Sequence, residues 1–165
     1  MSLAQAMKFT ISAEGRWTPI DGGTNYGVTQ SVYDAYRRMH GLPAQTVRCI
    51  TQAEVADIMN AEYWLPAMCE EMPALLGIAV FDCAFNTGVS EAIKLLQGCL
   101  GVVRDGIAGP MTMKAIDNAD QVMLLHDYLD ARRDFYRADT SQAEYLSGWL
   151  NRVNELQVYL RGIKL

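Results

Sequence analysis

Residues 74–85 read ALLGIAVFDCAF and decide the fold of this chain. Apolar side chains occupy almost every position, so a helix over this range is expected to be buried on most of its sides. Pro73 suits the first turn of that helix, and Asn86-Thr87-Gly88 ends it. A helix of this kind lies at the centre of a fold, and the rest of the chain should pack around it.

The segments on both sides of this run carry signals for further helices. Thr51-Gln52-Ala53-Glu54 is a capping box, because the Glu54 side chain can bond back to the amide of Thr51. Other helices are indicated by Ser, Thr or Asp before an apolar periodic stretch and by glycine or proline after it. The expected helices run from Thr29 to His40, Thr51 to Leu65, Ser90 to Leu100, Pro110 to Asn118, Asp120 to Ala138 and Gln142 to Leu160.

Strand-like sequence is confined to residues 15–28, where Gly22-Gly23 separates short segments rich in aromatic and branched residues. The predicted fold is therefore mainly α with a small β part, a helical bundle beside one β-hairpin near the N-terminus. A chain of 165 residues is long enough for one domain with a real core. We expect a single domain over residues 1–165, divided into a lobe at residues 1–72 with the hairpin and a helical lobe at residues 73–165.

The composition excludes several classes of function. Half of the residues are apolar and 20% are charged, as in an ordinary globular protein. The formal net charge of −5 provides no basic field to hold nucleic acid or anionic lipid. No apolar run reaches the roughly 18 residues that a membrane-spanning helix needs. We therefore expect no nucleic-acid partner and no membrane insertion.

The cysteines and histidines do not form a metal-binding pattern. The four cysteines include no C-x-x-C pair, and the two histidines lie far apart in the sequence. Zinc sites need closely spaced ligands of these types, so no metal is expected. Cys83 and Cys99 lie in apolar helical patterns and are expected to be small core residues.

Glu14 lies at the end of a short amphipathic helix and is the strongest candidate for a catalytic group. Leu3, Met7 and Ile11 recur at a spacing of four, and Glu14 comes three residues after Ile11, so its carboxylate continues the stripe that should face the core. Loss of hydration raises the pKa of a carboxyl toward neutrality, which lets it carry a proton to a leaving group. The alternative is an ordinary helix-terminal residue that turns to solvent.

Four motifs resemble, in the same order and at similar spacings, those of glycoside hydrolase family 108. Ala13-Glu14-Gly15 is followed by residues 21–29, DGGTNYGVT, although Arg16 replaces the usual second glycine after the glutamate. Residues 80–88 and 96–112 are similar to the predicted peptidoglycan-binding region of that family, and residues 148–153 to its C-terminal helix. Members of the family are lysozyme-like N-acetylmuramidases of phages, prophages and bacterial secretion loci.

This resemblance implies a lysozyme-like fold, with residues 1–72 as the catalytic lobe and a peptidoglycan-binding-like segment at residues 74–118. It implies a hydrolase that cleaves the β-1,4 bond between N-acetylmuramic acid and N-acetylglucosamine in peptidoglycan glycan strands. Glu14 is then the general acid, and the reaction uses water with no metal or organic cofactor. The alternatives are a peptidoglycan-binding module that does not cut and a lytic transglycosylase.

Cleavage of a glycosidic bond also needs a base, a nucleophile or an oriented water on the other face of the sugar. Asp21 and Thr24 are the nearby candidates, because the hairpin should fold back across a cleft from Glu14. Asp21 would act as a base or stabilise positive charge on the ring, and Thr24 or Asn25 would orient water. An Asp before Gly-Gly is equally typical of a simple turn.

Substrate contacts are expected from Asn25, Tyr26, Trp17 and Asn86. Tyr26 and Trp17 would stack on sugar faces, although aromatic residues in a small hairpin at least as often pack its own core. Asn86 would bond an N-acetyl group, or else serve only as a helix C-terminal cap.

Features nearer the C-terminus are expected to be architectural. Residues 105–112 look like a cell-wall-binding motif, but their physical content is a tight turn followed by a Gly-Pro helix start. Trp149 and Arg152 should lock the last helix onto the bundle.

The first residues show no charged segment followed by a long apolar stretch, so no secretion signal is expected. We therefore expect synthesis in the cytoplasm and action on the cell wall from the periplasm, after release through a holin-like pore or a dedicated export route.

Overall fold

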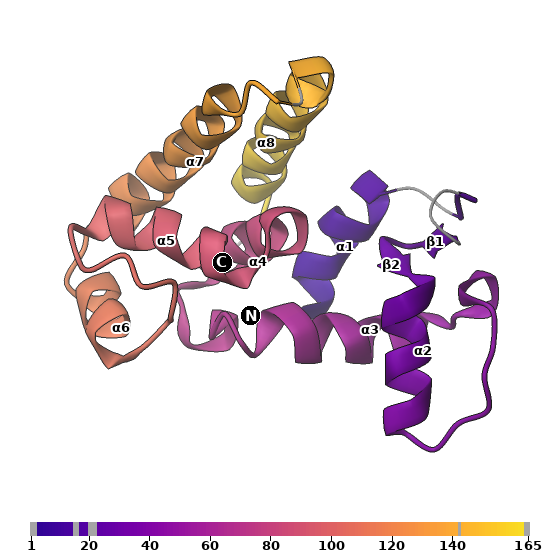
Figure 1. The fold of residues 1–165 in the computed structure, drawn as a ribbon. Helices are drawn as coiled ribbons and strands as arrows, with labels where there is room; N and C mark the ends of the chain where they lie inside the picture. Colours follow the sequence, from indigo (N-terminus) through magenta and orange to yellow (C-terminus); the bar gives the residue numbers. More distant parts are fainter. Residues whose placement is uncertain (1–2, 15–16, 20–22, 142, 164–165) are drawn as a thin grey trace.

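The computed structural model describes residues 3–14, 17–19, 23–141 and 143–163, without the side chains of residues 13 and 14. Its eight α-helices are α1 (Leu3–Glu14), α2 (Gln30–Met39), α3 (Gln52–Met59), α4 (Ala74–Thr87), α5 (Val89–Leu100), α6 (Pro110–Asp117), α7 (Gln121–Ala138) and α8 (Leu146–Arg161). Short helical turns are η2 (Val47–Cys49), η3 (Asn60–Trp64), η4 (Cys69–Glu71) and η5 (Ala143–Tyr145). Strands β1 (Thr24–Asn25) and β2 (Val28–Thr29) pair in an antiparallel sheet. The predicted helical fold with one small hairpin near the N-terminus is confirmed (Figure 1).

Helix α4 lies at the centre of the fold, as the sequence predicts. Every residue from Leu76 to Ala84 is buried. The helix packs against α1, α5 and α7, and Figure 1 shows it in the middle of the molecule. The buried side chains form one continuous core that extends from Ala6 in α1 to Leu160 in α8.

Most predicted helix starts are confirmed by their capping bonds. The capping box of Thr51 and Glu54 opens α3, and both of its hydrogen bonds are present. Thr29 caps α2, and the Asp120 carboxylate accepts the first free amides of α7. The predicted cap at Ser90 is wrong, because α5 already begins at Val89 directly after Gly88.

The hairpin turn lies four residues later than predicted. The sequence placed it at Gly22-Gly23, but β1 and β2 are joined by Tyr26 and Gly27, whose φ angles are 52° and 76°. Positive φ at both positions is the geometry that matches the twist of a two-residue hairpin, and it is unusual for tyrosine. An isolated bridge between Thr18 and Thr24 adds a third extended segment beside β1.

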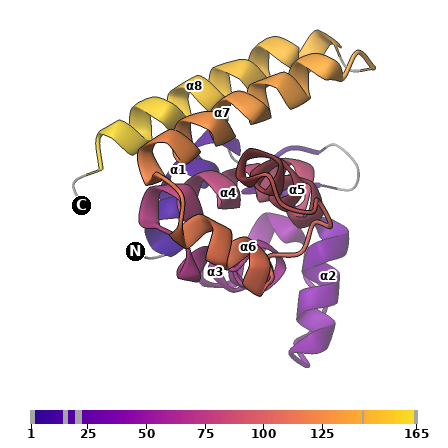
Figure 2. The same cartoon turned by 90° about the vertical axis from the view of Figure 1, so that its left-hand side faces the viewer.

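The last two long helices lie side by side across one face of the molecule. Figure 2 shows α7 and α8 as an antiparallel pair above the remaining helices. The expected helix from Gln142 to Leu160 begins later, with α8 starting at Leu146 after the turn η5. No helix in the described ranges is both long enough and apolar enough to cross a membrane.

A substitution at Gly77 tests how closely η4 approaches α4. A Cβ atom at this position would lie 2.6 Å from the backbone carbonyl oxygen of Cys69, which cannot move aside without shifting the chain. Gly77→Ala is therefore expected to destabilise the protein by about 1–3 kcal/mol in urea unfolding. Gly98→Ala is the matched control, since its Cβ would meet only Arg104 at 3.6 Å. Equal unfolding midpoints for the two variants would contradict the close packing.

Candidate functional site

Two of the predicted catalytic groups lie outside the described residues. Helix α1 ends at Glu14, but the Glu14 side chain and the whole of Asp21 are not among the residues that the structure describes. Their roles stay predictions. The backbone of α1 as far as Glu14 is described, as are the helices that α1 contacts.

The buried face of α1 is rotated slightly from the predicted stripe. Met7 is buried as expected, but Leu3 and Ile11 are only half-buried. Thr10 is instead fully buried. Because positions four apart share one face of a helix, Glu14 continues the line of Thr10.

Helices α1 and α8 run in opposite directions along their contact. The Tyr159 hydroxyl donates to the carbonyl of Gln5 at 2.8 Å, near the start of α1. Further along α1, Thr10 donates to Asp82 at 2.9 Å, and Asp82 also binds Arg152 at 2.8 Å. Residue numbers thus rise along α1 while they fall along α8, and the end of α1 lies toward the start of α8 (Figure 1).

Asp82 is the centre of a buried polar cluster that joins four helices. This residue of α4 is fully buried, and its carboxylate accepts hydrogen bonds from Thr10 of α1, Arg132 of α7 and Arg152 of α8. Arg132 is also fully buried and donates from Nε to the Tyr136 hydroxyl at 3.0 Å. The bond from Thr10 attaches α1 to α4, and the two arginines attach α7 and α8 to the same carboxylate, so the cluster contributes to the position at which α1 ends.

The charges in the cluster keep Asp82 ionised. Burial alone would raise the pKa of the Asp82 carboxyl, because it removes water from the anion. The charges of Arg132 and Arg152, together with their hydrogen bonds, outweigh burial and hold this pKa below its ordinary value. Asp82 is therefore a structural anion, and it carries no proton to donate at neutral pH.

The sequence analysis did not single out Asp82 or Arg132. The available signal was a carboxylate inside an otherwise apolar helix, since a buried charge requires a buried partner of opposite sign. That signal predicts the existence of a partner, but not that it comes from α7, 50 residues away along the chain.

One helical turn beyond this cluster, α4, α7 and α8 line a cavity. Asn86, Tyr136 and Trp149 lie one turn beyond the cluster residues of α4, α7 and α8, and Glu14 lies one turn beyond Thr10 on α1. The cavity, which we call the helix-end cavity, measures about 220 Å³ and is lined by Asn86, Thr87, Phe135, Tyr136, Asp139 and Trp149. The end of α1 and this cavity therefore lie at the same end of the bundle.

The predicted substrate contact Asn86 is exposed and lines the helix-end cavity. Its amide nitrogen also donates to the carbonyl of Asp82 at 3.0 Å, but Asn86 is not the helix cap that was the alternative, because α4 runs on to Thr87 and its cap is Gly88. Among the described residues, no hydrogen bond uses the second hydrogen of that nitrogen or the amide oxygen.

Asn25 and Trp17 are both held by the turn η2 that follows α2. Asn25 is buried, and its amide donates to the carbonyls of Val47 and Arg48 at 3.3 and 3.2 Å. Trp17 is 39% exposed, with the guanidinium carbon of Arg48 lying 4.9 Å from its ring centroid. The described contacts of both residues are structural, and their roles toward substrate stay predictions.

Thr24 and Tyr26 lie in the hairpin itself and are half-buried. Thr24 pairs with Thr29 across the two strands and exchanges two backbone hydrogen bonds with Thr18. Tyr26 occupies the first position of the turn. Their predicted parts in orienting water and stacking on sugar stay predictions.

Residues 105–112 are fastened to α5 through one side chain. The Gln97 amide donates to the Asp105 carboxylate at 2.7 Å and to the carbonyl of Ile107 at 3.1 Å, and its oxygen accepts from the amide of Gly106 at 2.9 Å. Gln97 is buried, so these bonds replace its water. The contacts agree with the architectural role expected for this segment.

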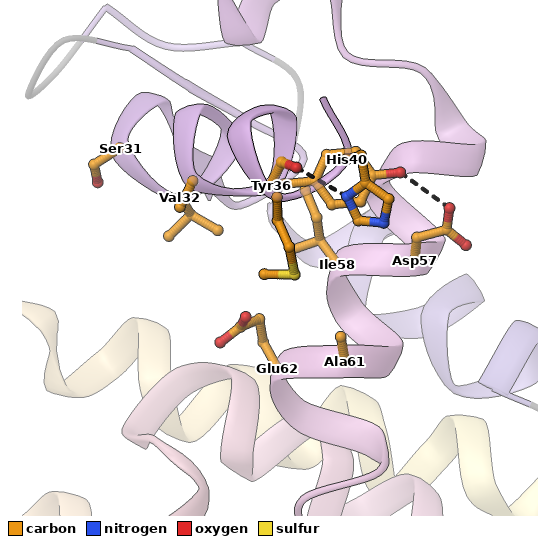
Figure 3. Close-up of a pocket in the computed structure, with 10 residues that line it drawn as sticks. Ser31, Val32, Tyr36, His40, Asp57, Ile58, Ala61 and Glu62 are labelled. Carbon is orange, nitrogen blue, oxygen red and sulfur yellow. Dashed lines mark hydrogen bonds between the residues drawn. The ribbon is translucent and has the colours of Figure 1, made fainter. Parts of the chain in front are cut away.

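A second cavity of about 390 Å³ lies between α2 and the α3–η3 region (Figure 3). Its walls are mainly apolar, and its polar groups include Tyr36, which donates to Asp57 at 3.1 Å, and His40, whose Nδ1 lies 2.9 Å from the Tyr36 carbonyl. Glu62 stands at its other side. No residue of α1, α4, α7 or α8 is among its described lining residues, so it is separate from the helix-end cavity.

Within the ranges that the structure describes, no three side chains of His, Cys, Asp or Glu come together as a metal site requires. Cys83 is buried and Cys99 half-buried, in agreement with their expected places in the helical core.

Comparisons with known proteins identify two regions in this chain. Residues 7–88 match the family described as Glycosyl hydrolase 108, and residues 91–154 match the Predicted Peptidoglycan domain. A solved structure of Brucella abortus SagA is similar, with 27% sequence identity and a TM-score of 0.81 over 95% of this chain and 92% of that chain. No curated protein matches the sequence.

Proposed function

Because the chain carries a glycosyl hydrolase 108 domain followed by a predicted peptidoglycan domain, we propose that it hydrolyses peptidoglycan. The bond it cuts is the β-1,4 bond between N-acetylmuramic acid and N-acetylglucosamine. One observation carries the proposal: the α1 end of the first domain lies at the same end of the bundle as a cavity lined by residues of both matched regions.

Glu14 is the proposed general acid. Its position follows that of buried Thr10 on α1, and Thr10 is bonded to Asp82, the carboxylate that also binds Arg132 of α7 and Arg152 of α8. A rigid support is what an acid needs to protonate one particular leaving oxygen, because small displacements of a catalytic group cost much of its effect. The Asp82 cluster thereby acts on the position of Glu14, and it takes no part in proton transfer.

In this proposal the hairpin supplies the groups that act on the other face of the sugar. Asp21 acts as base or stabilises positive charge on the sugar ring, while Thr24 orients water. Thr24 is anchored by its pairing with Thr29 and Thr18, so its hydroxyl is carried by a fixed backbone. Access of the protein to the wall by a holin-like pore or an export route is part of the same proposal.

Digestion of purified sacculi tests the proposal directly. We expect light scattering to fall and mass spectrometry to find reducing ends on N-acetylmuramic acid. Anhydro ends would instead indicate a transglycosylase reaction, in which the sugar's own hydroxyl attacks in place of water. Sedimentation of the protein with intact sacculi, with no loss of scattering, would leave only a binding module.

A further inference from the structure

The helix-end cavity is built from the junction of the two matched domains. Asn86 and Thr87 are the last residues of α4 and belong to the hydrolase match, whereas the other lining residues lie in α7, the segment after it, and α8. The cavity at this junction and the end of α1 lie at the same end of the bundle. A glycan strand on its way to the acid would therefore pass the cavity.

The aromatic part of the lining offers flat apolar surface through the half-buried Phe135 and Trp149, whereas Tyr136 is buried, with 4% of its surface exposed. Tyr136 and Trp149 stack with their ring centroids 5.2 Å apart and their planes 29° apart. Trp149 thus locks α8 onto α7, as the sequence predicts, and it also lines the cavity, which the sequence did not indicate. Aromatic rings pack well against the C–H face of a sugar, because that face is apolar.

The polar part of the lining has unused hydrogen-bonding capacity. Asn86 uses one amide hydrogen on the Asp82 carbonyl, and no described hydrogen bond uses its second amide hydrogen or its oxygen. The Asp139 oxygen Oδ1 accepts from the amide and hydroxyl of Ser141, and no described hydrogen bond uses Oδ2. A donor and an acceptor on one amide complement the C=O and N–H of an acetamido group.

Charge and size narrow the ligand further. Asp139 is the one charged residue among the described lining, and its negative charge disfavours an acidic ligand such as a lactyl or peptide carboxylate. The volume of about 220 Å³ is below the roughly 300–1,000 Å³ of typical drug-sized ligand pockets, so it suits a single ring and not a chain.

We propose that the helix-end cavity is a saccharide subsite that holds one N-acetylglucosamine ring of the strand. This inference rests on the proposed function. The ring packs on the half-buried Trp149, which stacks against Tyr136, while the Asn86 amide binds its acetamido group and Asp139 accepts from a sugar hydroxyl. The predicted peptidoglycan domain then contributes to the same cleft as the hydrolase domain.

Binding of chitotetraose, a neutral oligomer of N-acetylglucosamine, tests the subsite. Calorimetry in a Glu14→Gln background prevents cleavage during the measurement. Asn86→Ala should weaken binding about 3- to 10-fold, the range expected for the loss of one or two neutral hydrogen bonds. On natural sacculi fragments, Asn86→Ala with Glu14 intact should raise KM and leave kcat within about twofold.

Asn118→Ala is the matched control. Asn118 is also an exposed asparagine at a helix C-terminus whose amide donates to the carbonyl four residues earlier, at 2.7 Å, but it does not line the cavity. Equal affinities of the two alanine variants, or no binding of chitotetraose at all, would overturn the subsite. If the parent chain digests sacculi and both alanine variants bind chitotetraose equally well, the subsite alone is rejected. If Asn86→Ala weakens the binding of chitotetraose but the parent chain does not digest sacculi, the hydrolase is rejected.

Discussion

Glu14→Gln is expected to fold normally and to digest sacculi roughly 10²- to 10⁴-fold more slowly than the parent chain. Glutamine keeps the shape of the side chain but has no proton to give to the leaving oxygen. Removal of a group that acts only in the transition state should lower kcat and kcat/KM together. Initial rates of turbidity loss, with unfolding midpoints measured beside them, check this expectation.

Glu62→Gln is the control for this result. Glu62 is exposed on η3 and lines the cavity of about 390 Å³ between α2 and the α3–η3 region, here called the α2–α3 cavity. Its substitution removes the same chemical group from that cavity. Its activity should stay within about twofold of the parent chain, as for most surface substitutions. A folded Glu14→Gln protein with near-normal digestion would refute the assignment, and loss of activity in Glu62→Gln would move the site to the α2–α3 cavity.

Asp82→Asn is expected to destabilise the protein by about 3–5 kcal/mol. The substitution leaves the guanidinium of Arg132 fully buried without its anion, and it weakens the bonds to Thr10 and Arg152. A loss of this size is a large part of the stability of a single domain, so the unfolding midpoint in urea should fall strongly.

Asp130→Asn is the control that tests whether burial, and not ion pairing as such, causes the expected loss of stability in Asp82→Asn. Asp130 pairs with Arg133 at 2.7 Å, but half of its side chain is exposed, with 51% accessible. Exposed pairs contribute about 0–1 kcal/mol, so this variant should resemble the parent chain. Similar stability losses in the two variants would show that the Asp82 cluster has no special role.

The difference between Asp82→Asn and the parent chain should depend on pH. The pKa of the Asp82 carboxyl is lower in the folded protein than the unfolded value of about 3.9. The ionised carboxylate therefore contributes its full stability above about pH 4, and this contribution is lost as pH falls through the lowered folded pKa. Urea unfolding of both proteins should show their free energies converging in acid.

The sequence predicts those parts of the fold that depend on neighbouring residues. The capping box at Thr51 and the caps at Thr29 and Asp120 act within one turn, so local chemistry is sufficient to find them. The hairpin turn was placed wrongly because Gly22-Gly23 is the stronger local signal. The turn lies at Tyr26-Gly27, where tyrosine has positive φ, and the adjacent strand β1 packs on η2 through Asn25.

The candidate site was predictable only in its most exposed members. Asn86 lies in the last turn of α4, where a polar residue reaches the surface, and it lines the helix-end cavity, while its role toward substrate stays a prediction. The Asp82 cluster joins residues 50 to 72 positions apart, and no periodicity within one segment carries that information. The second role of Trp149 depends likewise on the crossing of α7 and α8 above the end of α4.

The single core around α4 has a consequence for how such proteins arise. The helix belongs to the first matched region, yet α5 and α7 of the second region cover it, and the buried apolar residues that the structure describes on both sides of residue 90 form one cluster. Modules joined by linkers can be shuffled between genes, because each folds alone. These two halves share their interior, so lineages would have to inherit and vary them as a unit. An engineer who wants to graft the predicted peptidoglycan domain onto another catalyst must transfer α4 with it.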